Sequence, residues 1–108
     1  MRPKVTYTIN NLKEGLVSKI ERLVSKEDIQ NFSNLTQDFH PLHTSPDYAK
    51  ENGFEDIIAH GLLLSSFSSS IIGMELPGDN AIIISQSFIY KKPVYPGTRL
   101  LIKGVINK

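Results

Sequence analysis

The stretch that decides the fold is GLLLSSFSSSIIGM, residues Gly61–Met74. It holds no charged residue, and its apolar side chains surround the helix axis, separated only by serines and one glycine. A helix that is apolar on nearly all sides is a buried one. Its serines can return hydrogen bonds to the backbone of their own helix, so their burial costs little. The stretch therefore predicts a long helix at the centre of the core.

Two shorter helices are predicted ahead of this stretch, each from its capping residues. Ser25 is followed three residues later by Asp28, which forms the pattern of a capping box. Ser45 precedes Pro46, and proline is favoured at the first helical position. Gly53 is expected to end that second helix.

Four β-prone segments complete the pattern. They are Thr6–Asn10, Leu16–Val24, Ala81–Tyr90 and Thr98–Ile106. Pro93, Pro96 and Gly97 break the pairing between the last two. The order of strand, helices, buried helix and strands predicts an α+β fold, an antiparallel sheet wrapped around a central helix in a single domain, residues 1–108.

Composition excludes several classes of function. A formal net charge of +1 without a basic run argues against a nucleic-acid partner. The chain has no cysteine, which excludes disulfides, thiolate nucleophiles and cysteine-ligated zinc. Residues Met1–Thr8 show no apolar run behind their charges, and no run approaches the roughly 20 residues of a membrane span. We therefore expect a cytoplasmic protein without a membrane anchor.

Two motifs carry the chemistry. DFHPLH at residues 38–43 places a carboxylate and an imidazole five residues apart on a loop pinned by Pro41, and AHGLL at residues 59–63 opens the apolar helix with a glycine. Together with LPG at residues 76–78 and the stretch from QSF at 86–88 to KPVYPG at 92–97, they resemble the MaoC-like, or hydratase-2, family of hot-dog domains. The resemblance covers the chain from about residue 12 onward.

The resemblance implies an (R)-specific enoyl-CoA hydratase or dehydratase, which adds water reversibly and in syn fashion to trans-2-enoyl-CoA thioesters. Asp38 and His43 would orient one water molecule, with His43 as the base and Asp38 as the acid. Histidine suits proton exchange near neutral pH, and partial burial suits an aspartate to the acid role. The alternative is that Asp38 caps a turn and His43 is an ordinary loop residue.

Gly61 and the helix that it opens are the candidate substrate contacts. The first-turn N–H groups of a helix lack internal acceptors, so they can bind the enolate oxygen, and glycine permits close approach. The alternative for Gly61 is steric necessity where the helix meets the sheet. Ser65, Ser68 and Ile72 follow on the same helix face and are candidates for lining an acyl tunnel, or are simply core.

The three histidines also give a His-x-x-His pair with a third imidazole, a spacing that occurs in metal sites. Pro41 places the pair on a loop, and the family that the chain resembles uses no metal, so no metal is expected. His60 is interpreted as a hydrogen-bonding residue at the helix entrance. The family usually has asparagine, which helps to hold substrate or water, where His40 stands, and the His40 imidazole can still donate a hydrogen bond there.

Other expectations follow from the resemblance. A hot-dog sheet usually continues for about two more strands, so the C-terminal strands are missing from this chain; a fragment, strands supplied by a partner, and a degenerate protein all remain open. We expect acyl-CoA as partner, no cofactor beyond the coenzyme A of the substrate, and at least a homodimer. An acyl-CoA thioesterase and a non-catalytic acyl-CoA-binding or scaffold subunit remain alternatives. Such thioesterases generally carry an acidic residue on the central helix, and Gly61–Met74 has none.

Overall fold

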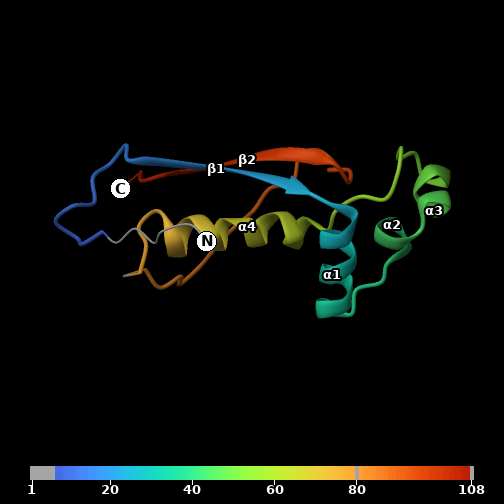
Figure 1. The fold of residues 1–108 in the computed structure, drawn as a ribbon, viewed down its shortest axis with the longest axis horizontal. Coiled ribbons are helices and arrows are strands. Elements are labelled where there is room, and N and C mark those ends of the chain that lie inside the picture. The colour runs from blue at the N-terminus through green and yellow to red at the C-terminus, as the bar shows by residue number, and fades with distance from the viewer. Residues whose placement is uncertain (1–6, 80, 108) are drawn as a thin grey trace. The chain divides into compact units, whose positions relative to one another are not determined.

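The computed structural model describes residues 7–79 and 81–107, whose elements follow the order β1, α1, α2, α3, α4 and β2 (Figure 1). The strands are β1, Val17–Val24, and β2, Thr98–Val105; the helices are α1, Lys26–Thr36, α2, Pro41–Thr44, α3, Pro46–Glu51, and α4, Gly61–Met74. The α+β class is confirmed, and the central helix has the bounds predicted from its uncharged sequence. None of the helices described is both long and apolar enough to cross a bilayer.

The two strands pair in opposite directions. The N–H of Ile106 donates to the carbonyl of Leu16 at 2.9 Å, and the N–H of Gly97 donates to the carbonyl of Val24 at 2.7 Å. The beginning of each strand thus meets the end of the other, which makes the two-stranded sheet antiparallel.

Both ends of α1 are capped by side-chain or backbone hydrogen bonds. Ser25 Oγ accepts the N–H of Asp28 at 3.0 Å, and Asp28 Oδ2 accepts the N–H of Ser25 at 2.9 Å, so the predicted capping box is confirmed. At the other end, Gln37 is in the left-handed conformation with φ 64° and donates its N–H to the Ser33 carbonyl. This residue ends the helix and turns the chain into Asp38.

The chain groups into two compact units. The first contains the described parts of residues 1–21, 65–88 and 101–108, and the second contains residues 22–64 and 89–100. In the first unit the end of β2 approaches α4 closely, because a Cβ built on Gly104 would lie 3.2 Å from Cγ2 of Ile71. In the second unit the buried side chains of Val24 and Ile29 form the core beside α1. The prediction of a single domain over residues 1–108 stays a prediction.

Two predicted strands are not formed. Residues 81–90 run without a sheet partner among the residues described, and Ile82 and Ile84 are 90% and 95% exposed. Residues 7–10 contain a turn instead of a strand, and Thr6 lies outside the described residues. Alternating side chains make a segment suitable for a sheet, but a strand exists only where a second backbone accepts and donates its hydrogen bonds.

Burial of α4 is uneven rather than complete. Leu63 and Ile71 are buried, whereas Leu62 is 66% exposed. Composition shows that every side of this helix tolerates burial, but only the sides that meet other parts of the chain are covered.

Candidate active site

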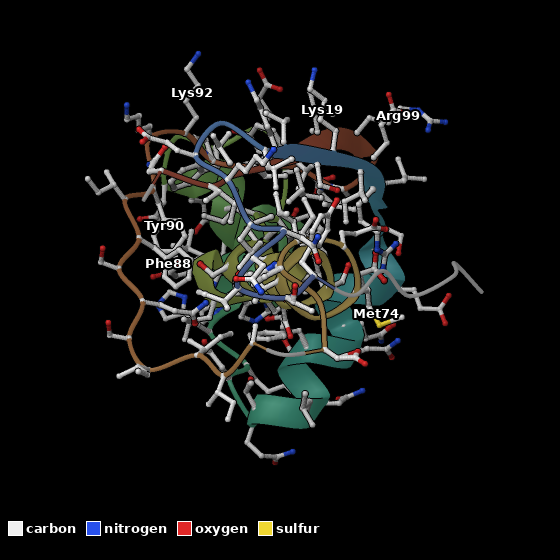
Figure 2. The ribbon with its side chains drawn as sticks, turned by 90° about the vertical axis from the view of Figure 1, so that its left-hand side faces the viewer. Lys19, Met74, Phe88, Tyr90, Lys92 and Arg99 are labelled. Carbon is white, nitrogen blue, oxygen red and sulfur yellow. The ribbon has the colours of Figure 1, made fainter. Side chains whose placement is uncertain are left out.

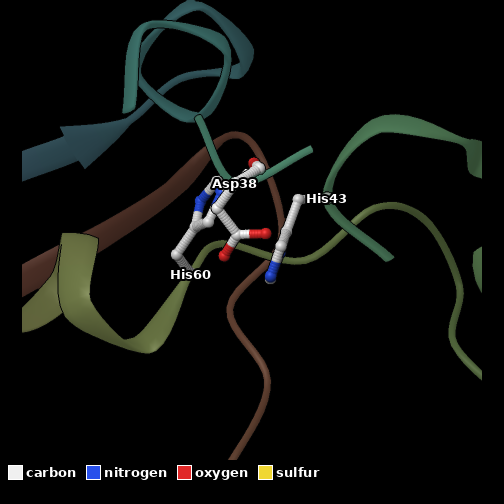
Figure 3. A group of neighbouring side chains, drawn as sticks. All are labelled: Asp38, His43 and His60. Atoms are coloured by element: carbon white, nitrogen blue, oxygen red, sulfur yellow. Dashed lines mark hydrogen bonds between the residues drawn. The ribbon is translucent and has the colours of Figure 1, made fainter. Parts of the chain in front are cut away.

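Three side chains from separate segments converge in the second unit (Figure 3). Asp38 follows α1, His43 belongs to α2, and His60 directly precedes α4. One carboxylate oxygen of Asp38 and one ring nitrogen of each histidine all lie within 4.8 Å of one another. The structure therefore brings together the two residues predicted as acid and base, and it adds His60 to them.

The segment that carries His43 is helical. Pro41 is the first residue of α2, and Nδ1 of His40 accepts the N–H of Leu42 at 3.1 Å as an N-cap. The expectation of a loop was wrong here, because proline fixes the backbone angle that the first helical position needs. The same sequence signal, proline after a capping side chain, was used for α3 and was also present at residue 40.

His43 has a defined tautomer. Its Nδ1 lies 2.7 Å from the carbonyl oxygen of Ile58. A carbonyl only accepts hydrogen bonds, so Nδ1 carries the proton and Nε2 of the neutral ring carries the lone pair. This is the arrangement that a general base needs. No sequence signal pointed to Ile58, because the contact uses its backbone.

Asp38 is exposed, in contrast to the partial burial that the acid role had suggested. Its Oδ1 accepts the N–H of His40 at 3.1 Å, an Asx turn within the motif. The carboxylate is therefore fixed locally by its own loop, and no buried wall covers it in the part of the chain that is described.

His60 is the buried member of the group, with 3% of its surface exposed. Its Nε2 lies 3.1 Å from Oγ of Ser33 and 3.4 Å from the carbonyl oxygen of Asp38, and its ring stacks on that of His43 at 3.8 Å and 21°. Burial lowers the pKa of His60, and charge on His43 lowers it further, while the carbonyl and the charge of Asp38 oppose the shift. His60 therefore favours the neutral form.

The geometry of the group does not direct its nitrogen lone pairs to one point. Imidazole lone pairs lie in the ring plane, and the rings of His43 and His60 stack nearly parallel. Stacked rings direct these lone pairs side by side, whereas a tetrahedral metal needs them to converge at about 2.0–2.1 Å. The expectation of no metal here stays a prediction.

A cavity of about 330 Å³ reaches both His43 and Gly61. Its remaining walls are Phe54, Ile58, Ala59, Leu64, Tyr90, Lys91, Lys92, Pro93 and Val94. Tyr90 and Lys92 both belong to the segment after residue 88, and Lys92 extends outward from the ribbon (Figure 2). A largely apolar cavity beside an imidazole has walls of the kind that suit an acyl group.

Gly61 has a steric neighbour that the sequence did not reveal. A Cβ at this position would lie 2.8 Å from Cε2 and 2.9 Å from Cζ of Tyr90. The steric explanation for the glycine thus has direct support, although the cavity beside Gly61 is compatible with a substrate contact as well.

The other predicted contacts are placed differently. His40 packs edge-on against Tyr48 at 6.0 Å and against His43 at 6.1 Å, with its Nδ1 occupied as the cap of α2. Ser65 and Ile72 belong to the first unit, where the Ser65 carbonyl accepts the Ser68 hydroxyl and Ile72 lines a separate cavity of about 470 Å³. Their roles in substrate binding stay predictions.

Comparison with known proteins identifies the family that this chain matches. The family model of the MaoC-like domain matches residues 8–107. An (R)-specific enoyl-CoA hydratase of Rhodospirillum rubrum is 37% identical over 93 residues, which are 86% of this chain and 65% of that protein. A mitochondrial 3-hydroxyacyl-[acyl-carrier-protein] dehydratase of Arabidopsis thaliana is 40% identical over 90 residues, 83% of this chain and 53% of that protein. The chain thus spans less than two thirds of these relatives.

A solved structure agrees with the sequence comparisons. The (R)-hydratase from Aeromonas caviae involved in PHA biosynthesis superposes with a TM-score of 0.85 at 32% identity, covering 90% of this chain and 74% of that one. The hot-dog fold expected from the resemblance is confirmed. The chain belongs to the MaoC-like domain family.

Proposed function

We propose that the chain catalyses the reversible hydration of trans-2-enoyl-CoA thioesters to (R)-3-hydroxyacyl thioesters. The observation that carries the proposal is the pairing of Asp38 with His43, whose Nδ1 proton is held by Ile58 so that its Nε2 is basic. Two polar atoms up to 4.8 Å apart can share one water molecule at hydrogen-bond distances of about 2.8 Å. The relative named as an (R)-specific hydratase supports the stereochemistry.

The proposed addition uses both residues on one water molecule. His43 Nε2 takes a proton from water as the water oxygen bonds to Cβ, and the C=C electron pair moves toward the thioester oxygen. Asp38, acting as the acid, delivers a proton to Cα on the same face as electrons return from that oxygen. Proton transfer from His43 to Asp38 then restores both groups, so the net change is addition of one water.

The beginning of α4 supplies the electrostatic part of the proposal. The N–H groups of Gly61 and Leu62 precede the hydrogen bonds that Leu63 and Leu64 donate to the His60 carbonyl, and they lie at the positive end of the helix dipole. An enolate oxygen placed beside Gly61, in the cavity that also reaches His43, would accept such an N–H. Preorganised donors of this kind contribute about 3–4 kcal/mol to a transition state.

Hydration of crotonyl-CoA by the purified protein tests the proposal. We expect Asp38→Asn and His43→Ala each to lower kcat by about 100-fold or more. Asp47→Asn, which changes the same chemical group on the exposed first turn of α3, is the matched control and should keep the wild-type rate. Unchanged turnover in both site variants would show that the assignment is wrong.

A second candidate function is the same hydration or dehydration reaction with the acyl group carried by acyl carrier protein instead of coenzyme A. The plant relative is named as a dehydratase of acyl-carrier-protein thioesters and is 40% identical to this chain. Assays that offer crotonyl groups on coenzyme A and on acyl carrier protein distinguish the two by kcat/KM. Release of free thiol would instead reveal the thioesterase, and binding of acyl-CoA without turnover would reveal the non-catalytic subunit.

The remaining expectations belong to the same proposal. The reaction needs no cofactor beyond the coenzyme A carried by the substrate, and the protein is proposed to act in the cytoplasm as a homodimer. Light scattering of the purified protein over a concentration series measures the oligomeric state directly.

A further inference from the structure

His60 is a buried titratable side chain that the proposed reaction leaves without a role. Its backbone carbonyl accepts the N–H groups of Leu63 at 3.0 Å and Leu64 at 3.3 Å, the bonds that begin α4. The backbone of His60 thus takes part in the first hydrogen bonds of α4, and its ring is buried in the site.

The hydrogen bonds of the ring assign its proton. Nε2 lies 3.4 Å from the Asp38 carbonyl, which can only accept, so this nitrogen is the donor, and the closer Ser33 hydroxyl at 3.1 Å holds the same edge of the ring. Nδ1 is then the unprotonated nitrogen. It is buried and has no hydrogen-bond partner among the described residues.

The face of the His60 ring contacts His43. It stacks on His43 at 3.8 Å and 21°, while Phe32 of α1 packs against it at 4.9 Å and 58°. The plane of His43 is therefore defined twice, at its edge by the Ile58 carbonyl and on its face by His60.

We propose that His60 is a positioning residue that sets Asp38 and His43 relative to each other. It contacts the backbone of the first and the ring of the second. The inference rests on the proposed hydration for its functional meaning. Misplacement of a reacting group by about 1 Å can cost about 100-fold in rate, so such a support has a measurable effect.

The charge state of the site agrees with this role. Because burial and charge on His43 both lower the pKa of His60, a positive charge on His43 favours the neutral form of His60 beside it. His43 can then take a proton from water while the ring beneath it remains neutral.

Two variants separate the two contacts. His60→Gln keeps an N–H donor but removes the aromatic face, and His60→Phe keeps the face but removes the donor. We expect both to lower kcat for crotonyl-CoA by about 10- to 100-fold while KM changes less than about threefold. Ile29→Val removes one methylene from the buried face of α1 and is the control for lost stability, with kcat unchanged.

A double-variant cycle distinguishes positioning from a purely structural role. In a His43→Ala background, His60→Gln should cost less than about threefold in kcat, because the ring that it positions is gone. An equal loss in both backgrounds would overturn the proposal.

Ring-nitrogen NMR tests the same inference without turnover. It is the deciding experiment if His43→Ala is too slow for the double-variant cycle to be measured. We expect His60 protonated at Nε2 and a protected Nδ1–H signal from His43, which His60→Gln broadens and His60→Phe retains. A His43 signal insensitive to His60→Gln, or a proton on Nδ1 of His60, would overturn the proposal. The expected NMR pattern in a protein that does not hydrate crotonyl-CoA would refute the proposed function instead.

Discussion

The hydrogen bond between His43 and the Ile58 carbonyl is short, at 2.7 Å, and it joins residues that are 15 positions apart. Because it fixes the proton on Nδ1, it determines at a single residue whether the site contains a base or a donor. A rotated ring would place the proton toward the cavity and reverse the chemistry. Positioning of this ring is therefore as important as its identity.

A pair of variants at Gly61 and Tyr90 separates steric from catalytic need. Gly61→Ala places a Cβ 2.8 Å from the Tyr90 ring, so we expect a loss of about 1–3 kcal/mol in unfolding free energy. In a Tyr90→Ala background the same change should cost less than about 1 kcal/mol. Urea unfolding of the four proteins measures this coupling.

The hydration rates of those proteins add the functional test. If Gly61→Ala costs little stability in the Tyr90→Ala background but still lowers kcat/KM relative to Tyr90→Ala alone, Gly61 also serves the substrate. Recovery of both would leave steric fit as the whole explanation.

The pKa of His60 predicts a specific sensitivity to acid. Burial lowers this pKa below the ordinary 6.5, so the unfolded chain binds the proton more readily than the folded one. The stability that neutral His60 contributes is complete above about pH 6.5 and is lost as the pH falls below it, because protons then favour the unfolded chain. Asp38 and His43 are the charged groups that face it.

Urea unfolding at pH 7.5 and at pH 5 tests this expectation. The wild type should lose more stability between the two values than His60→Gln, whose side chain does not titrate. His40 and His43 are present in both proteins, so their titration contributes to both curves. Equal losses would contradict the lowered pKa.

The sequence nominated candidate site residues but not their contacts. The resemblance carried by the DFHPLH motif implied an acid and base pair at Asp38 and His43, and the structure brings these two side chains together. The Ile58 carbonyl, the stacking of His60 and the Tyr90 ring above Gly61 had no local signal, because each depends on segments that meet only after folding. Local motifs can nominate reactive groups, whereas tautomers and steric limits are set by the assembled site.

At the scale of elements, the cap of α1 can be tested directly. Ser25→Ala removes the oxygen that accepts the Asp28 N–H at 3.0 Å, so we expect a loss of about 1 kcal/mol. Arg22 also reaches Asp28 at 3.1 Å, but that pair is partly exposed and adds little. Chemical unfolding at pH 7 gives the difference, and Ser69→Ala, on an exposed position of α4, is the matched serine control with little expected effect.

The same elements show which local signals are sufficient. The capping box of α1 and the uncharged run of α4 each encode a helix within consecutive residues, and both helices were predicted. The segment 81–90 is rich in β-branched and aromatic residues but has no sheet partner among the described residues. Strand formation depends on a second segment, so β propensity alone overestimates it.

At the scale of the whole molecule, the chain spans 65% of the Rhodospirillum relative and matches the MaoC-like domain over residues 8–107. Its exposed apolar surface includes Ile82 and Ile84 on the extended segment. Unpaired β-prone segments with exposed apolar side chains pair readily with other chains.

This surface predicts concentration-dependent self-association through residues 82–84. Replacing Ile82 and Ile84 with lysine should shift light-scattering masses toward smaller species at a given concentration, because charge on an unpaired strand opposes pairing. Leu35→Lys is the matched control, since Leu35 is 80% exposed but lies on a helix. If the control lowers association as much as the paired change, general hydrophobicity rather than strand pairing drives the contact. If neither change affects the measured mass, the segment 82–84 takes no part in association.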